Sequence, residues 1–208
     1  MSAPKFIIGI GLIACMPLLQ GCIFAAAGAA ATTGYVATQE RSAGTAVDDT
    51  TIWAGVKERL VRHNAKELLT GVNVEVIEGK VHLTGTVTSS ETRIDAVRLA
   101  WQVKGVKEVV NEIQIVPLQD KTVGNLAHDS WVSTQIRSKM LFNTDIRSLN
   151  FSIDVVRGTA YLMGIARSQH ELDALTEVAS TTPGINKVIS YVRVENTEAD
   201  SSPNPSAE

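Results

Sequence analysis

The chain contains two copies of one sequence pattern, and this internal repeat constrains its fold more than any other feature. Three glycines recur at a spacing of 79 residues: Gly79, Gly85 and Gly105 in the first copy, and Gly158, Gly164 and Gly184 in the second. The apolar pattern of residues 49–60 recurs at a spacing of 80, in residues 129–140. The two spacings differ by one, so one residue has been gained or lost between the helix pattern and the glycine pattern. The repeat predicts two similar modules.

Within each copy, the period of the apolar residues changes in the same order. In the first copy, apolar residues recur every fourth position from Ile52 to Leu60, which predicts a helix. Alternating apolar residues over 72–76 and 81–83 predict two strands, joined by a tight turn at Glu78-Gly79. A second helix follows between a capping signal at 88–91 and Gly105, and a third strand spans 109–116.

The second copy repeats this order over residues 132–194, with a turn at Arg157-Gly158 and a capping signal at 168–171. The predicted order in each module is αββαβ. We therefore expect an α+β fold of two tandem modules, each a three-stranded mixed sheet with two helices on one face.

The N-terminus carries an export signal. Leu19-Gln20-Gly21-Cys22 resembles a bacterial lipobox, and the apolar run from Phe6 to Leu19 is shorter than the roughly 20 residues needed to cross a bilayer. Residues 1–21 are thus expected to be a lipoprotein signal peptide, removed before Cys22 receives its diacylglycerol and N-acyl chain. The alternative is an uncleaved signal anchor, because residues 23–31 are also uncharged. The weak membrane insertion of an Ala/Gly-rich segment favours the lipoprotein.

Composition excludes several classes of protein. Without residues 1–21 the 208-residue chain keeps 187 residues, and Cys22 is the only cysteine left. An internal disulfide and a cysteine-based metal site or nucleophile are then excluded. The formal charge of −3 becomes −4 when Lys5 is removed, which argues against general nucleic-acid binding.

The remaining boundaries follow from composition. Residues 22–46 are rich in Ala, Gly and Thr without apolar periodicity, and we expect a flexible tether. The modules are placed at 47–117 and 128–195, with a polar linker at 118–127 and a disordered polar tail at 196–208.

These residues resemble a known family. Two features are similar to those of the BON domain. One is the glycine in the central strand, Gly85 and Gly164, and the other is the Gly-Val/Ile-x-x-Val segment, at 105–109 and 184–188. Two such modules after a lipobox and an Ala-rich tether resemble the dual-BON outer-membrane lipoproteins. The resemblance implies a lipid-anchored protein that faces the periplasm, binds anionic phospholipid through its second module and supports envelope integrity. Ile23 agrees with outer-membrane sorting, because an Asp there commonly retains lipoproteins in the inner membrane.

The two copies differ at one exposed helical position. Trp131 corresponds to Thr51, and at 100° per residue it lies about 140° from the inward direction set by Ile136. No acidic residue occurs between Asp129 and Asp145. A tryptophan on a locally basic helix face suits a membrane interface, where the indole lies at headgroup depth.

The candidate phospholipid-binding residues all belong to this helix: Trp131, Thr134, Gln135, Arg137, Ser138, Lys139, Leu141 and Phe142. The alternative is that Trp131 packs against the first module or the linker. Trp53 is interpreted as a packing or docking residue of module one, and Trp101 as a partly buried core residue.

A second difference lies on the open faces of the sheets. His82, Thr84 and Thr86 of the first module are replaced in the second by an apolar row, Tyr161, Met163 and Ile165. An exposed row of this kind needs a cover. We expect this candidate docking face to contact module one, the linker or a partner, and outer-membrane assembly proteins are the alternative partners.

Catalytic signals are absent from the sequence. The four histidines, His63, His82, His128 and His170, lack metal-ligand spacing and are interpreted as solvated or capping residues. The sequence contains neither a phosphate-binding loop nor a nucleophile elbow. Asp48-Asp49 is interpreted as a helix N-terminal cap. We therefore expect no enzyme, no metal and no cofactor beyond the lipid on Cys22.

Overall fold

The computed structural model describes residues 43–195, which contain both modules. The predicted signal peptide, the acylated Cys22, most of the tether and the tail at 196–208 lie outside the described residues.

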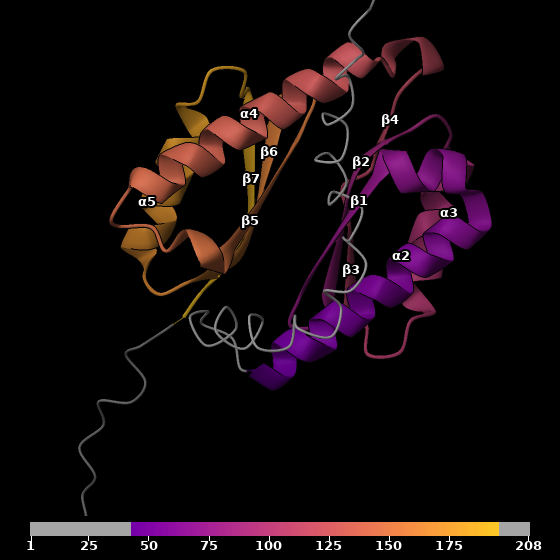
Figure 1. The fold of residues 1–208 in the computed structure, drawn as a ribbon, viewed down its shortest axis with the longest axis horizontal. Helices are drawn as coiled ribbons and strands as arrows, with labels where there is room; N and C mark the ends of the chain where they lie inside the picture. Colours follow the sequence, from indigo (N-terminus) through magenta and orange to yellow (C-terminus); the bar gives the residue numbers. More distant parts are fainter. Residues whose placement is uncertain (1–42, 196–208) are drawn as a thin grey trace, which may run out of the picture. The chain divides into compact units, whose positions relative to one another are not determined.

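Each module has the predicted order of elements (Figure 1). The first consists of α2 (Ala43–Gly71), β1 (Val72–Ile77), β2 (Lys80–Val87), α3 (Ser90–Trp101), β3 (Glu108–Asn111) and β4 (Gln114–Ile115). A 3-10 turn, η1 (Leu118–Asp120), leads to the second, which consists of α4 (Val123–Phe142), the 3-10 turn η2 (Ser148–Asn150), β5 (Phe151–Val156), β6 (Thr159–Ala166), α5 (Gln169–Ser180) and β7 (Lys187–Val194).

Both sheets are mixed, as expected. β1 is antiparallel to β2, and β3 is parallel to β2, so β2 is the central strand. β4 pairs with β2 in the register that β3 sets, because Lys80 faces Glu108 and Thr86 faces Gln114. β3 and β4 therefore form one strand, interrupted where the Asn111 side chain accepts the Ile113 N–H at 3.2 Å. The second sheet has the same order, β5-β6-β7, with β7 uninterrupted.

The hairpin turns are those that the sequence predicts. Glu78 and Gly79 have φ values of 55° and 81°, and Arg157 and Gly158 have values of 50° and 75°. Positive φ at both central residues defines a type I′ turn, whose twist matches that of the flanking strands. The turns fix the strand register, so that Val72 faces Gly85 in one module and Phe151 faces Gly164 in the other.

In each module, both helices lie on one face of the sheet and share its core (Figure 1). The apolar stripe of α2 packs with Leu99 of α3 and with alternate residues of β1 and β2. The equivalent stripe of α4 packs with Leu175 of α5 in the second module. The core residues are those that the helical and strand periods predict, since burial on one face produces those periods.

Both first helices begin earlier than predicted. α2 begins at Ala43, inside the segment assigned to the tether, and Ala46 is buried. α4 begins at Val123, inside the predicted linker, because the Thr122 side chain caps it by accepting the Asn125 N–H at 3.2 Å. The linker is therefore limited to η1 and its flanking residues.

The connector between helix and first strand is where the repeat changes its spacing. In module one, Asn64 departs from helical geometry with φ −153° and ψ 86°, and its side chain accepts the Glu67 N–H. The Asn64 side chain thereby caps a second helical segment, which continues to Gly71. Module two instead ends α4 at Phe142 and reaches β5 through a loop and η2.

Candidate functional site

The outward face of α4 exposes large apolar side chains. Trp131 is 60% exposed, Leu141 70% and Phe142 86%. The indole is therefore not sequestered in the second module's core. Thr134 and Ser138 are also exposed on this helix, and Thr134 Oγ1 donates to the Ser130 carbonyl at 2.9 Å. We call the exposed Trp131, Thr134, Ser138, Leu141 and Phe142 the α4 surface.

Arg137 and Lys139 flank this surface on opposite sides, and each is held by a hydrogen bond. Arg137 Nη2 donates to the Ile153 carbonyl at 2.6 Å, and Lys139 Nζ donates to Thr182 Oγ1 at 2.9 Å. Neither cation forms an ion pair with a carboxylate of residues 43–195. Both cations therefore lack a carboxylate partner among these residues and lie on the helix that carries the exposed indole.

Gln135 differs from the other candidate residues. Its side chain is half-buried, and its Nε2 has no hydrogen-bond partner within the described part of the chain. At 100° per residue it lies about 40° from Trp131 toward the buried side of α4. The structure thus brings seven of the eight candidates to the solvent-facing side of α4 and turns Gln135 toward the core.

Comparison of the two modules indicates a structural role for the long cationic side chain at position 137. In module one, Trp53 Nε1 donates to the Val74 carbonyl at 3.1 Å and Lys57 Nζ donates to the Val72 carbonyl at 3.3 Å. Lys57 occupies the position equivalent to Arg137. In each module the first helix therefore covers carbonyl groups of an edge strand, β1 or β5, which protects that edge from pairing with another chain. Arg137 combines this structural contact with its charge.

The predicted docking face of module two is buried against module one. Tyr161, Met163 and Ile165 form an apolar cluster with Ile77 of the first module, and each of the three is at most 2% exposed. Gln114 Nε2 donates to the Tyr161 hydroxyl at 3.3 Å. Module one therefore covers this row within a single chain.

Polar contacts surround the apolar cluster. Arg193 forms a bidentate ion pair with Glu78, at 3.0 and 3.1 Å. The Tyr191 hydroxyl donates to Glu112, and its pKa is raised to about 12 by burial, together with that hydrogen bond and the negative charge of Glu112. Tyr191 is therefore a neutral donor at neutral pH.

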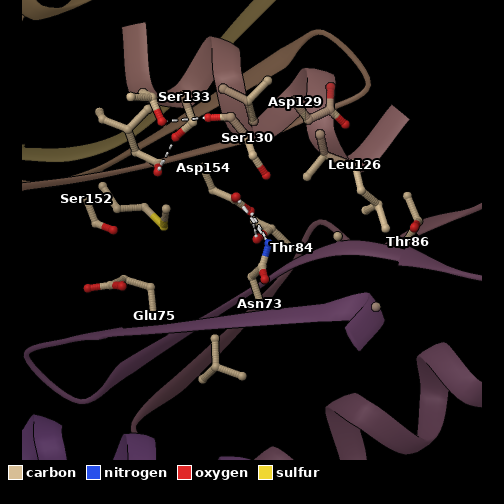
Figure 2. Close-up of a pocket in the computed structure, with 18 of the residues that line it drawn as sticks. Asn73, Glu75, Thr84, Thr86, Leu126, Asp129, Ser130, Ser133, Ser152 and Asp154 are labelled. Carbon is tan, nitrogen blue, oxygen red and sulfur yellow. Dashed lines mark hydrogen bonds between the residues drawn. The ribbon is translucent and has the colours of Figure 1, made fainter. Parts of the chain in front are cut away.

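A cleft of about 600 Å³ opens beside this contact, between β1 and β2 of module one and α4 and β5 of module two. Figure 2 shows Asn73 and Thr84 of the first module meeting Asp154 of the second. The Asn73 amide donates to both Asp154 oxygens, at 3.0 and 3.1 Å. The other labelled side chains are mainly hydroxyls and carboxylates, so the cleft is more polar than an apolar ligand pocket.

The interpretation of His82 was wrong. His82 is buried rather than solvated, because its strand lies under module two. Trp101 is 51% exposed, because Leu99 and Ala100 fill the inward side of α3.

Asp49 was also misassigned: it accepts the backbone N–H groups of Glu78 and Gly79, both at 2.8 Å, and so binds the hairpin turn instead of capping a helix.

The described residues 43–195 contain no cluster of three His, Cys, Asp or Glu side chains that could hold a metal ion. Within the same range, none of the helices combines the length and the hydropathy needed to cross a membrane.

Sequence reasoning did not single out Leu126 or Leu149, which are both exposed. Each is an isolated apolar residue among polar neighbours, without a periodic signal.

Comparison with known proteins finds relatives along most of the chain. An uncharacterized protein in the gshII 5′ region of Anaplasma centrale is 41% identical over 152 residues, which cover 73% of this chain and 98% of that protein. Outer membrane lipoprotein DolP of Haemophilus influenzae is 34% identical over 172 residues, covering 82% of this chain and 87% of DolP. Osmotically-inducible protein Y of Escherichia coli is 29% identical over 146 residues, covering 70% of this chain and 72% of that protein.

The BON domain matches the chain twice, over residues 48–117 and 128–196. These two ranges cover the two αββαβ modules except for the first residues of α2 and α4, and each includes the positive-φ glycine of its central strand. The chain therefore belongs to the BON-domain family, of which it carries two tandem copies.

Proposed function

We propose that this BON-domain protein is held by acylated Cys22 on the periplasmic face of the outer membrane and binds anionic phospholipid through the α4 surface. The relative named outer membrane lipoprotein DolP supports the location, because the match covers 87% of its length. The proposed role is non-catalytic: the protein supports envelope integrity by concentrating at anionic regions of the membrane.

The observation that carries the proposal is the composition of the α4 surface. An exposed tryptophan, leucine and phenylalanine occur on one helix beside two cations without carboxylate partners. Aromatic side chains with a polar edge favour the headgroup region, and each cation near an anionic surface contributes about 1 kcal/mol. Two cations thus account for roughly a thirtyfold preference for anionic over neutral lipid.

Titration of the fragment that lacks residues 1–22 with vesicles tests the lipid contact. Binding is expected to require an anionic lipid such as phosphatidylglycerol, to weaken with added salt, and to be lost in Trp131→Glu. Trp101→Glu is the matched control, since Trp101 is also about half exposed but lies on module one. Equal binding to phosphatidylcholine vesicles, or equal loss in both variants, would contradict the proposal.

Intact-mass measurement of the protein extracted from membranes tests the anchor separately. The expected mass is that of residues 22–208 plus the diacylglycerol and the N-acyl chain. An unmodified full-length chain would instead indicate a signal anchor.

An adaptor that recruits assembly proteins through Tyr161, Met163 and Ile165 is less well supported. These side chains are buried between the two modules, so a partner could reach them only if the modules separated.

A further inference from the structure

The strand β7 has an edge that no other strand of the described residues covers. It runs without interruption from Lys187 to Val194 and pairs only with β6. The Lys187 and Glu195 N–H groups donate to carbonyls at the two ends of β6, those of Gly158 and Ala166, at 3.3 and 2.7 Å. Because the backbone groups of successive strand residues point to opposite sides, every second residue between these two directs its N–H and C=O away from β6. These outward residues are Val188, Ser190, Val192 and Val194.

The other edges of the two sheets are protected, as edges of natural sheets usually are. Side chains of the first helices bond to the outer strands: Trp53 and Lys57 to β1, and Arg137 to β5. The edge of module one that corresponds to β7 is divided into β3 and β4 at the Asn111 contact. Within residues 43–195, β7 is thus the edge that has neither a bound helix side chain nor an interruption.

The elements around β7 contact its faces rather than its edge. Val188 and Val192 pack against the helix-side core of module two. Tyr191 and Arg193 lie on the opposite face, where both bond to carboxylates of module one. One local contact lies along the edge: the Val192 N–H donates to Ser190 Oγ at 3.3 Å, and the strand remains continuous there. The backbone groups of this edge are therefore accessible to a further strand.

From these observations we infer that two copies of the chain pair antiparallel along β7, which joins their three-stranded sheets into one continuous sheet. Pairing about a two-fold axis uses the same edge of both copies and closes as a dimer. The outward residues must face one another for their N–H and C=O groups to bond. In the register centred on Tyr191, Val188 faces Val194 and Ser190 faces Val192 of the second copy. All the outward residues are then paired, whereas a shift in either direction leaves one of them beyond the end of the other strand.

Charge favours the same register. It places Lys187 of each copy opposite Glu195 of the other, so the two-fold axis produces this pair at both ends of the contact. Neither side chain forms an ion pair within residues 43–195. No like charges face each other, since Arg193 lies opposite Ile189. The edge is therefore complementary to itself, which favours a second copy of this chain over an unrelated strand.

Sedimentation equilibrium of the full chain in a nonionic detergent measures this association without any anionic lipid. The average mass is expected to rise with concentration from that of one chain to a limit of two. Lys187→Glu and Glu195→Lys each place like charges opposite each other and should weaken association by about tenfold. The double variant Lys187→Glu/Glu195→Lys restores opposite pairs and should restore association. Arg62→Glu, at an exposed position of α2, is the control for net charge and should leave association unchanged.

Ser190→Pro tests the backbone pairing itself. It removes an N–H group that points away from β6, so the ladder within module two is kept and the module should still fold. Association should be lost. Ser190→Ala is the matched control, because it removes the same hydroxyl but keeps the N–H group, and it should associate like the wild type. Circular dichroism of both variants checks that the fold is retained.

Amide hydrogen exchange locates the contact on the strand. Exchange at Ile189 and Tyr191 should not depend on protein concentration, because these residues are already paired with β6. Raising the concentration should slow exchange at the outward residues, Val188, Ser190, Val192 and Val194.

A single-chain mass at every concentration overturns the inference. Slow exchange of the outward amides in the single-chain species also overturns it, since the chain's own residues 196–208 would then cover the edge. Masses above that of two chains, or association that survives Ser190→Pro, would place the contact elsewhere. A double charge variant that stays monomeric, or an Arg62→Glu effect equal to that of Lys187→Glu, overturns the register. None of these outcomes bears on lipid binding by the α4 surface.

Discussion

The glycines that reveal the repeat lie where two backbone segments approach closely. Gly85 and Gly164 have φ values of 110° and 145°, which residues with a Cβ rarely adopt. A Cβ at Gly164 would lie 2.2 Å from the Asn150 carbonyl oxygen, and one at Gly85 would lie 2.2 Å from the Gly71 oxygen. In both modules the central strand therefore touches the chain just before the first strand, and only glycine leaves room.

Gly164→Ala should lower the free energy of unfolding by about 3 kcal/mol, because the new methyl group meets backbone atoms that cannot rotate away. Urea denaturation followed by circular dichroism measures the change. Gly124→Ala is the matched control: the nearest atom to a Cβ there is Thr122 Oγ1, at 3.8 Å. That variant should be neutral or slightly more stable than the wild type. Equal stability of the two variants would show that the strand can shift to make room.

A carboxylate organises the start of the second helix in each module, and in module two it is fully buried. Glu171 is 1% exposed and accepts the backbone N–H groups of Arg147 and Arg167, at 2.7 and 2.8 Å. Burial alone would raise its pKa, but the hydrogen bonds from the Arg167 side chain and from these two N–H groups outweigh burial and lower it. In module one, Glu67 of α2 takes the corresponding role by accepting the Thr88 N–H at 2.6 Å.

At the scale of elements, an aspartate of the first helix holds the first hairpin. Asp49 lies in α2 and is buried, and its two oxygens accept the Glu78 and Gly79 N–H groups of the turn. Asp129 of α4 accepts the Arg157 N–H at 2.9 Å in the second module. These hydrogen bonds thereby fix the helix and the hairpin relative to each other, in addition to the apolar core between them.

Asp49→Ala should cost about 3 kcal/mol of stability, since it removes two charge-assisted hydrogen bonds and leaves two turn N–H groups without their acceptor. Asp48→Ala is the control, because the Asp48 side chain is exposed on the same helix. Urea titrations of both variants provide the measurement. A loss of similar size in Asp48→Ala would indicate that the effect comes from helix charge rather than from the turn.

Apolar periodicity was sufficient to predict the helices and strands, because one-sided burial imposes the same spacing on sequence and structure. The starts of α2 and α4 were not predicted. The helical segments before Val47 and His128 are too short or too polar to show an apolar period. The cap at Thr122 was recognisable only once Asn125 was known to be helical. The roles of Asp49 and Glu171 depend on residues 29 and 24 positions away, which no local pattern contains.

At the scale of the whole molecule, the sequence difference between the two modules predicted which sheet surface must be covered. It did not predict which part of the chain, or which partner, covers that surface. The apolar row at Tyr161, Met163 and Ile165 required a cover, and the structure places Ile77 of the same chain against it. The exposure of Trp131 could be predicted from the helix angle alone. The partners of Arg137 and Lys139 could not, because they belong to β5 and to Thr182 after α5.

The buried imidazole of His82 links the stability of this packed pair to pH. His82 is 5% exposed, its ring centroid lies 5.1 Å from that of Tyr191, and its Nδ1 has no hydrogen-bond partner among residues 43–195. Burial lowers the His82 pKa, Lys80 lowers it further, and Glu108 partly opposes both. The unfolded chain therefore takes up a proton near pH 6.5, whereas the folded chain resists protonation until a lower pH.

Between those two pKa values the unfolded state binds more protons, so the free energy of unfolding should fall as the pH is lowered from about 7.5 to about 5.5. His82→Gln, which carries no titrating group, should show a shallower dependence in urea titrations at the two pH values. His128→Gln, which replaces a histidine exposed to solvent, is the matched control. Glu171 and Glu67, whose pKa values are lowered, lose their stabilising ionisation only below about pH 4.5, outside this window. Identical pH dependence in wild type and His82→Gln would mean that the imidazole reaches water while the two modules remain packed.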